Sequence, residues 1–137
     1  MSYGTTAALQ GAVYQHLIAD PSLTGLVGGA IFDAVPAGPL PATYVTLGAE
    51  DARDMSDKTG SGARHDLIVS VVTDSAGFQT AKDVAAAISD ALVGANLALA
   101  RGRLVSLDFQ KARARREGTG ELRRIDITFR ARVDDTP

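Results

Sequence analysis

The sequence predicts an α+β domain, with a mainly antiparallel sheet of about five strands and two long helices on one face of it. Three observations lead to this fold class. Two segments carry apolar residues at helical spacing, the other apolar runs are short, and turn-forming residues join most of them. The expected order is α-β-β-β-α-β-β. With 137 residues, no internal repeat and no dividing linker, the chain is expected to form a single domain over residues 1–137.

The first long helix is expected over residues 5–19. Its apolar positions recur every fourth residue, at Leu9, Val13 and Leu17. The pair Asp20 and Pro21 ends this helix, because proline disfavours helical geometry in the residue before it. One more helical turn is expected over residues 21–27, followed by a short strand over residues 30–34.

A proline-rich connection leads into the next strand and then into a loop. PAGPLPA, which starts at Pro36, contains three prolines and must be stiff and extended. Residues 43–49 (TYVTLGA) alternate as a strand does. Residues 50–62 hold one apolar side chain besides alanine, so burial cannot offset the entropy cost of ordering them. We therefore predict a mobile loop over residues 50–63.

This predicted loop is a candidate docking site. Loops of such length are uncommon inside compact domains and are often functional. A mobile segment can become ordered when it meets a partner. The candidate docking residues are Asp51, Arg53, Asp54, Met55, Asp57 and Lys58.

The next two elements form the centre of the predicted fold. Residues 65–74 are apolar on both faces, which predicts a central strand with a helix on one side and a second cover, such as a partner, on the other. Residues 75–93 predict the second long helix, with Asp74 or Ser75 at its N-cap and Gly94 just past its end. Its apolar stripe comprises Phe78, Val84, Ala85, Ile88 and Leu92.

A long projecting hairpin over residues 104–133 completes the predicted fold. Its strands, residues 104–115 and 122–133, are joined through residues 117–121. The second strand alternates strictly, with an apolar face made by Ile125, Ile127, Phe129, Ala131 and Val133. Alternation in the first strand would put an apolar set and a basic set on one face: Val105, Leu107 and Phe109 with Lys111, Arg113 and Arg115. The base of the hairpin is therefore expected in the core and its tip in solvent.

The basic tip of this hairpin allows two interpretations. Its charges could protect the sheet edges from aggregation, or they could form an arm that contacts another subunit or ring. The candidate contact residues are Lys111, Arg113, Arg115, Arg116, Arg123 and Arg124. The charge distribution suits a head-to-tail contact: residues 1–100 hold four cations and ten carboxylates, whereas residues 101–137 hold ten cations and six carboxylates.

A nucleic-acid-binding module on the same basic residues is the less favoured alternative. The chain has a net charge of −2, no helix-turn-helix or zinc-finger spacing, and no aromatic pair on the basic strands to stack on bases. Contact with the backbone of passing DNA needs only positive charge and stays open.

The sequence offers no pattern typical of an enzyme. His16 and His65 are the only histidines, and neither belongs to a hydrolytic triad motif or to a metal-ligand spacing. The chain has no cysteine, so disulfides are excluded, and this suits a protein made in a reducing cytoplasm. The N-terminal residues resemble neither a signal peptide nor a membrane span. We expect no catalytic, cofactor or metal site and no membrane partner.

The whole chain resembles a known family. The resemblance is carried by MSYGTTAALQGAVYQHL, GGAIFDAVPAGPLPATYVTLG, RHDLIVSVVTDSAGFQTAKDVAAAISDAL, GRLVSLDF and GELRRIDITFRARV. These segments are similar to the small tail terminator, or tail completion, proteins of siphophage-type tails, and particularly to the version in the gene transfer agents of alphaproteobacteria. YVTLG and HDLIVSV are the most telling motifs, and neither carries chemistry.

This resemblance implies a structural role. Such proteins have an α+β fold and assemble as a hexameric ring on the last ring of the tail tube, where they stop polymerisation and present a surface to the head-completion, or stopper, protein. DNA later passes through the lumen. The implied location is the bacterial cytoplasm during assembly and then the head-tail junction of a phage-like particle. A stopper connector is the alternative within the structural class.

Overall fold

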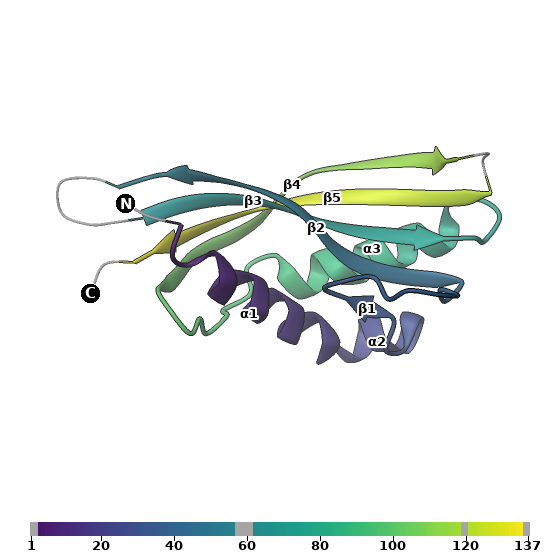
Figure 1. Cartoon of the computed structure of the whole chain (residues 1–137), viewed down its shortest axis with the longest axis horizontal. Coiled ribbons are helices and arrows are strands. Elements are labelled where there is room, and N and C mark those ends of the chain that lie inside the picture. Colours follow the sequence, from purple (N-terminus) through teal and green to yellow (C-terminus); the bar gives the residue numbers. More distant parts are fainter. Residues whose placement is uncertain (1–2, 57–61, 119–120, 136–137) are drawn as a thin grey trace.

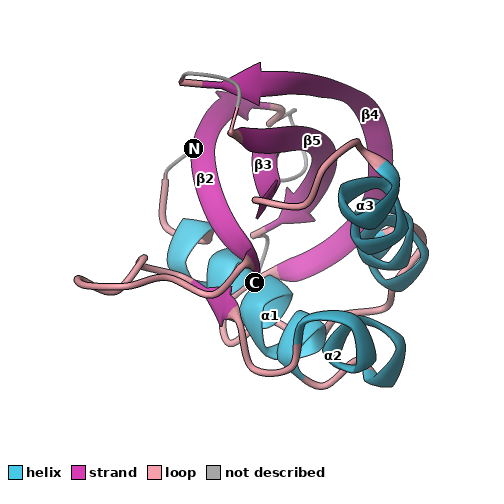
Figure 2. Ribbon diagram, turned by 90° about the vertical axis from the view of Figure 1, so that its right-hand side faces the viewer, coloured by secondary structure: helices cyan, strands magenta, loops and turns pink. Residues whose placement is uncertain are grey.

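The computed structural model describes residues 3–56, 62–118 and 121–135. They form one five-stranded sheet with three helices against one of its faces (Figures 1 and 2). The elements in chain order are α1 (Thr6–Ile18), α2 (Pro21–Val27), β1 (Ile31–Phe32), β2 (Thr43–Asp54), β3 (Gly62–Thr73), α3 (Gln79–Leu92), β4 (Arg103–Glu117) and β5 (Leu122–Asp134). We call the sheet face that the helices cover the helix face, and the opposite one the outer face.

The predicted α+β class and element order are confirmed, with two differences. The sheet order is β1-β2-β3-β5-β4, and β1 runs parallel to β2, so the sheet is mixed and not purely antiparallel. The two main helices are short, with 13 residues in α1 and 14 in α3. A parallel β1 is possible because the connection over residues 33–42 brings the chain back along the sheet edge before β2 begins.

Capping residues explain where the helices begin and end. Asp20 caps α2 by accepting a hydrogen bond from the Leu23 amide, and Pro21 occupies the first turn, where it needs no donor. The predicted start of α3 was wrong, because the helix begins at Gln79 with Phe78 as its N-cap. Gly94, at φ 70°, lies just past its end as predicted.

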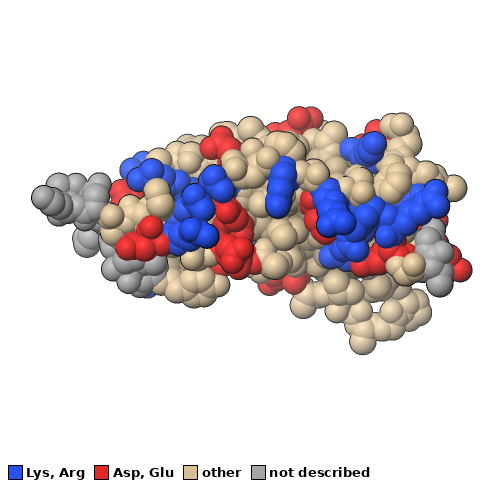
Figure 3. All heavy atoms as spheres, turned by 90° about the horizontal axis from the view of Figure 1, so that it is seen from above, with Lys and Arg blue, Asp and Glu red and all other residues tan. Residues whose placement is uncertain are grey.

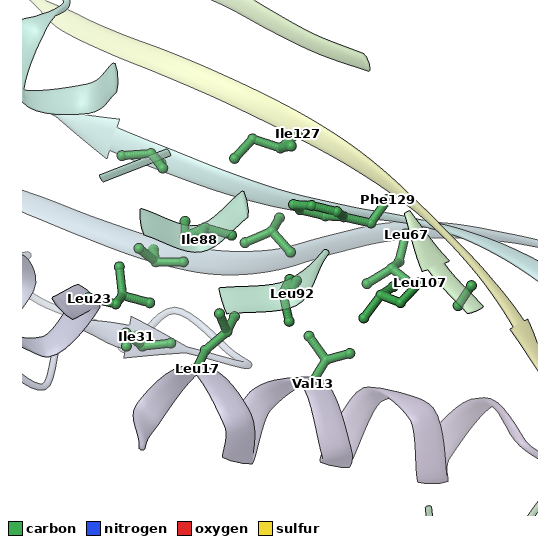
Figure 4. Packing of buried hydrophobic residues seen from close by; sticks show 14 of the residues in the cluster. Val13, Leu17, Leu23, Ile31, Leu67, Ile88, Leu92, Leu107, Ile127 and Phe129 are labelled. Atoms are coloured by element: carbon green, nitrogen blue, oxygen red, sulfur yellow. The ribbon is translucent and has the colours of Figure 1, made fainter. Parts of the chain in front are cut away.

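The core lies between the helices and the helix face of the sheet (Figure 4). Leu9, Val13 and Leu17 of α1 are buried, as their spacing predicts. Phe129 is fully buried on β5, among apolar side chains from both layers. Because this packing uses residues from every helix and strand, and Leu97 from the connection after α3, the core orients the whole sheet against the helices.

The prediction that β3 is central is confirmed, and its second cover comes from the chain itself. Ser70 and Val72 point to the outer face, yet both are buried. The neighbouring strands place Tyr44 and Arg124 directly beside Val72 in the register. Long side chains lying over the outer face can cover apolar surface while keeping their polar ends in water. No second subunit is needed to bury this end of β3.

The predicted loop over residues 50–63 was wrong at both ends, since Glu50–Asp54 belong to β2 and residues 62–63 begin β3. Glu50–Asp54 continue β2 and pair with residues 63–67 of β3, after an irregularity in the register between Leu47 and Glu50. The physical reason is tertiary: β3 offers a full ladder of hydrogen-bond partners, which outweighs the weak strand propensity of acidic residues. Met55 and Ser56 follow the strand, whereas Asp57 and Lys58 lie outside the described residues.

Candidate interaction surface

The hairpin formed by β4 and β5 carries the predicted contact residues. The two strands pair from Arg103↔Asp134 to Glu117↔Leu122. β4 is the edge strand of the sheet, and residues 108–114 are all exposed. The basic residues therefore lie along an accessible edge of the molecule.

The predicted face of the basic residues was wrong, because β4 contains two bulges. They lie between Leu104 and Ser106 and between Phe109 and Lys111. Each bulge adds one residue to β4 and inverts its alternation. Phe109 therefore stays opposite Phe129 on the helix face, whereas Lys111 lies opposite Thr128 on the outer face.

The six predicted contact residues divide between the two faces of the sheet. Lys111, Arg113, Arg115 and Arg124 lie on the outer face, and Arg116 and Arg123 lie on the helix face. Figure 3 views the outer face and shows Lys and Arg gathered over both ends of the sheet, with Asp and Glu beside them. The cations therefore do not form one uninterrupted basic surface.

Two of the outer-face arginines belong to an ion-pair network centred on Asp126. Its carboxylate accepts hydrogen bonds from Ser70 Oγ at 2.6 Å and Arg124 Nε at 2.8 Å, and it lies 3.5 Å from Arg115 Nη2. Glu117 lies within 4 Å of both arginines. Burial opposes ionisation of Asp126, but the hydrogen bonds from Ser70 and Arg124 and the arginine charges outweigh it and lower its pKa.

A second ion pair lies nearer the other end of the outer face. Arg130 donates to both oxygens of Asp66, at 2.8 and 3.2 Å, and Arg64 lies 3.9 Å away. The hydrogen bond from Arg130 is the main reason that the pKa of Asp66 lies below its usual value. Bidentate pairs of this kind hold both side chains in place. These arginines therefore stabilise the pairing of strands within the sheet.

Arg123 also has a partner within the chain. Its Nη1 donates to the Ser75 carbonyl oxygen at 3.3 Å, and its guanidinium lies 5.6 Å from the centre of the Phe78 ring. These contacts attach the hairpin to the connection between β3 and α3. By contrast Lys111, Arg113 and Arg116 form no ion pair with any described residue, and all three are exposed. These three are the predicted contact residues that remain available to a partner.

The structure places the predicted docking residues mostly on a strand. Asp51 and Arg53 lie on the outer face of β2, and Asp54 ends that strand. Asp54 accepts hydrogen bonds from Ser56, which lower its pKa. Met55 follows the strand and is exposed. These residues form a short exposed edge at the opposite end of the sheet from the basic tip (Figure 1).

A polar network beside this edge was not predicted from the sequence. His65 is fully buried, and its Nδ1 donates to Glu50 Oε2 at 3.1 Å. Glu50 also accepts hydrogen bonds from Thr6 Oγ1, at 2.6 and 2.8 Å to its two oxygens, and from the Tyr3 hydroxyl at 2.7 Å. The network joins the start of α1 to β2 and β3. Its hydrogen-bonded pairs are 15 to 47 residues apart, so no local pattern reveals it.

Comparisons with known proteins decide the family. Residues 11–134 match the family model described as "Tail completion protein gp17". The chain belongs to this family. One of 19 matching chains from solved structures comes from the structure titled "Virion of native gene transfer agent (GTA) particle". The two chains are 62% identical, and the match covers 97% of this chain and 99% of the virion chain, with a TM-score of 0.93. Among curated proteins, none is significantly similar.

Membership of the tail completion family supports a structural role for this chain. Within residues 3–56, 62–118 and 121–135, no helix is long and apolar enough to cross a membrane. Several charged side chains of the outer face pair with one another, and those on β2 and β4 that are unpaired among the described residues are exposed on sheet edges. Within the described ranges, the edges of β2 and β4 therefore carry unpaired charges that a partner can reach.

Proposed function

We propose that this tail completion protein forms a hexameric ring that caps the tail tube, ends its polymerisation and joins it to the head connector. The observation that carries the proposal is the 62% identity, over 97% of the chain, to a chain of a gene transfer agent virion. At this identity and a TM-score of 0.93, the two chains share their fold in detail. The role is structural and non-enzymatic.

The proposed mechanism is complementarity of shape and charge. A ring of identical subunits needs two different surfaces on each subunit, one that fits the other. Residues 1–100 carry a net charge of −6 and residues 101–137 one of +4, which supplies such a pair. One ring face would fit the tube end, while the other has no surface equivalent to the tube and so admits no further tube subunit.

The unpaired cations of the hairpin are the proposed contacts of this ring. Lys111, Arg113 and Arg116 would meet acidic side chains of a neighbouring subunit or of the adjoining ring. The paired residues Arg115, Arg123 and Arg124 would shape the hairpin that presents them. The residues after Asp54, with Met55 exposed, would dock at the other end of the sheet.

A gene deletion tests the proposed role. We expect tails of uncontrolled length, or heads without tails, because nothing would then end the tube or join it. Normal particles from the deletion strain would contradict the proposal. The protein is proposed to act first in the cytoplasm of the producing bacterium and then at the head-tail junction, so labelled protein should mark that junction in images of intact particles.

Mixing the purified protein with purified tail-tube protein separates the terminator from a stopper connector. A terminator caps the tube ends in projection images, whereas a stopper leaves them bare and binds only the finished cap. The exposed cations also permit a nucleic-acid-binding role, in which DNA in the lumen would be their target. That alternative predicts duplex binding with a steep salt dependence, and the absence of binding at low salt would eliminate it.

A further inference from the structure

Two half-edges of the sheet are open. β1 pairs with β2 only at Val45 and Thr46, so residues 48–54 of β2 have no strand partner on that side among the described residues. The Gly94 amide donates to the Leu107 carbonyl oxygen, so the connection after α3 occupies the first part of the β4 edge. Residues 109–117 of β4 remain open. Each half-edge presents unpaired backbone groups that can template another strand.

The two half-edges lie at opposite ends of the molecule (Figure 1). Antiparallel pairing runs from β2 through β3 and β5 to β4, so β2 and β4 point in opposite directions. A second copy in the same orientation could therefore place its β2 antiparallel to the β4 of the first. Contact between the two open halves requires an offset along the strands, and such an offset is usual where tilted strands close into a ring.

The two half-edges carry opposite charges. The β4 half holds four cations and one carboxylate: Lys111, Arg113, Arg115, Arg116 and Glu117. The β2 half holds three carboxylates and one cation: Glu50, Asp51, Asp54 and Arg53. Pairing of β4 with β4, or of β2 with β2, would oppose like charges, which destabilises cross-strand contact. Only the unlike edges attract, and this favours a head-to-tail arrangement.

Single residues on both halves lack partners within the chain. Asp51 lies directly opposite Asp66, whose charge is already balanced by Arg130 and Arg64. Asp51 makes no ion pair with any described residue, and neither does Arg113. On the helix face of β4, Phe109 is 46% exposed and is followed on that face by two small exposed residues, Ala112 and Ala114. A strand laid along this edge would meet little steric obstruction there.

We propose that the open half of β4 in one copy pairs antiparallel with the open half of β2 in the next copy, extending the sheet from subunit to subunit. This inference rests on the ring of the proposed function and names the surfaces that close it. The edge charges then have two effects. They prevent each edge from pairing with its own kind, and they select the unlike edge of a second copy.

Cysteine cross-linking tests this contact, because the chain has no cysteine of its own. Ala52 and Ala114 both lie on the helix face and on the facing half-edges, so A52C/A114C provides one thiol for each side. Within one chain the two positions are at opposite ends of the sheet, and a disulfide requires Cα atoms less than about 7 Å apart. A52C/A112C covers the neighbouring register. A52C/A86C is the matched control, with its second thiol on the exposed side of α3.

We expect mild oxidation of particles that carry either edge pair to give covalent multimers of this chain, and particles with the control pair to give none. Variant particles with tails of normal length but no cross-linking above the control would overturn the contact and leave the ring intact. Failure of the proposed function would look different, because the protein would then be missing from the head-tail junction altogether. Thermal melts of the purified variants confirm that each one folds.

A charge exchange in the A52C/A112C background, whose register sets Asp51 opposite Arg113, gives a second, independent measurement. R113E or D51R alone should lower the cross-linked fraction about tenfold, because each one opposes like charges across the contact. The combined variant R113E/D51R restores an attractive pair and should recover most of the loss. Equal losses in the single and combined variants would overturn the proposed pairing of these edges.

Discussion

Replacing Glu50 by alanine should destabilise the protein markedly, although the sequence predicts this residue in a mobile loop. The Glu50 side chain is only 12% exposed and accepts hydrogen bonds from Thr6, Tyr3 and His65. E50A leaves the fully buried His65 ring without its carboxylate acceptor and frees the start of α1 from the sheet. In a mobile loop, the same substitution would change nothing.

The magnitude follows from the burial of each donor. Hydrogen bonds to a charged group contribute about 1.5–3 kcal/mol each. The bond from His65 counts most because that ring is fully buried, and the bond from the half-buried Thr6 counts in part. Tyr3 is 61% exposed, so water replaces its bond at little cost. Removing the carboxylate also removes its own desolvation cost, which reduces the expected loss to about 2–4 kcal/mol. The melting temperature should fall by roughly 6–12 °C.

Urea denaturation followed by far-ultraviolet circular dichroism measures this loss, since the chain has no tryptophan to report it. D51A is the matched control, because Asp51 is the next residue, is exposed, and lies opposite Asp66. It should be neutral or slightly stabilising. E50Q keeps one acceptor oxygen, so its free energy of unfolding should lie between those of E50A and D51A. If E50A and D51A differed by less than about 0.5 kcal/mol, the strand assignment of residues 50–54 would be refuted.

Two further predictions concern stability. D126N should cost about 1–2 kcal/mol at pH 7 by weakening the bonds from Ser70 and Arg124. Since folding lowers the pKa of Asp126, this contribution is present above about pH 4 and is lost as pH falls through the folded-state pKa. The urea midpoints of the wild type and D126N should therefore approach each other as the pH falls below about 4. A gap between the midpoints that stays constant would contradict the network. G102A should lower the melting temperature more than G77A. Both glycines have positive φ, but only at Gly102 would a new Cβ lie 2.9 Å from another side chain. Equal shifts in the two melts would rule out that crowding.

Local periodicity was enough to find the elements that bury one regular stripe. The spacing of Leu9, Val13 and Leu17 predicted α1, and the strict alternation from Ile125 to Val133 predicted both the position of β5 and its buried face. In these elements the residues that determine burial are neighbours in sequence, so the pattern is complete within the element. The fold class followed from these patterns, as did the central position of β3.

Local periodicity could not predict the bulges of β4 or the strand at residues 50–54. A bulge is set by how one backbone pairs with another, and nothing in the alternation of β4 marks the extra residues near Val105 and Gln110. Glu50 has low strand propensity, and only the ladder offered by β3 makes it part of a strand.

The sequence by itself determined the fold class, the main helices, the alternation of β5 and which quarter of the chain is basic, because these properties depend on residues close together in the chain. Only the tertiary structure decided which cations are free. Arg115, Arg124 and Arg130 are neutralised by Asp126 and Asp66, whereas Lys111 and Arg113 are not. The physical reason is that ion pairs and open sheet edges arise between strands that the sequence separates, and a charge becomes available to a partner only when no neighbour in the fold has paired with it.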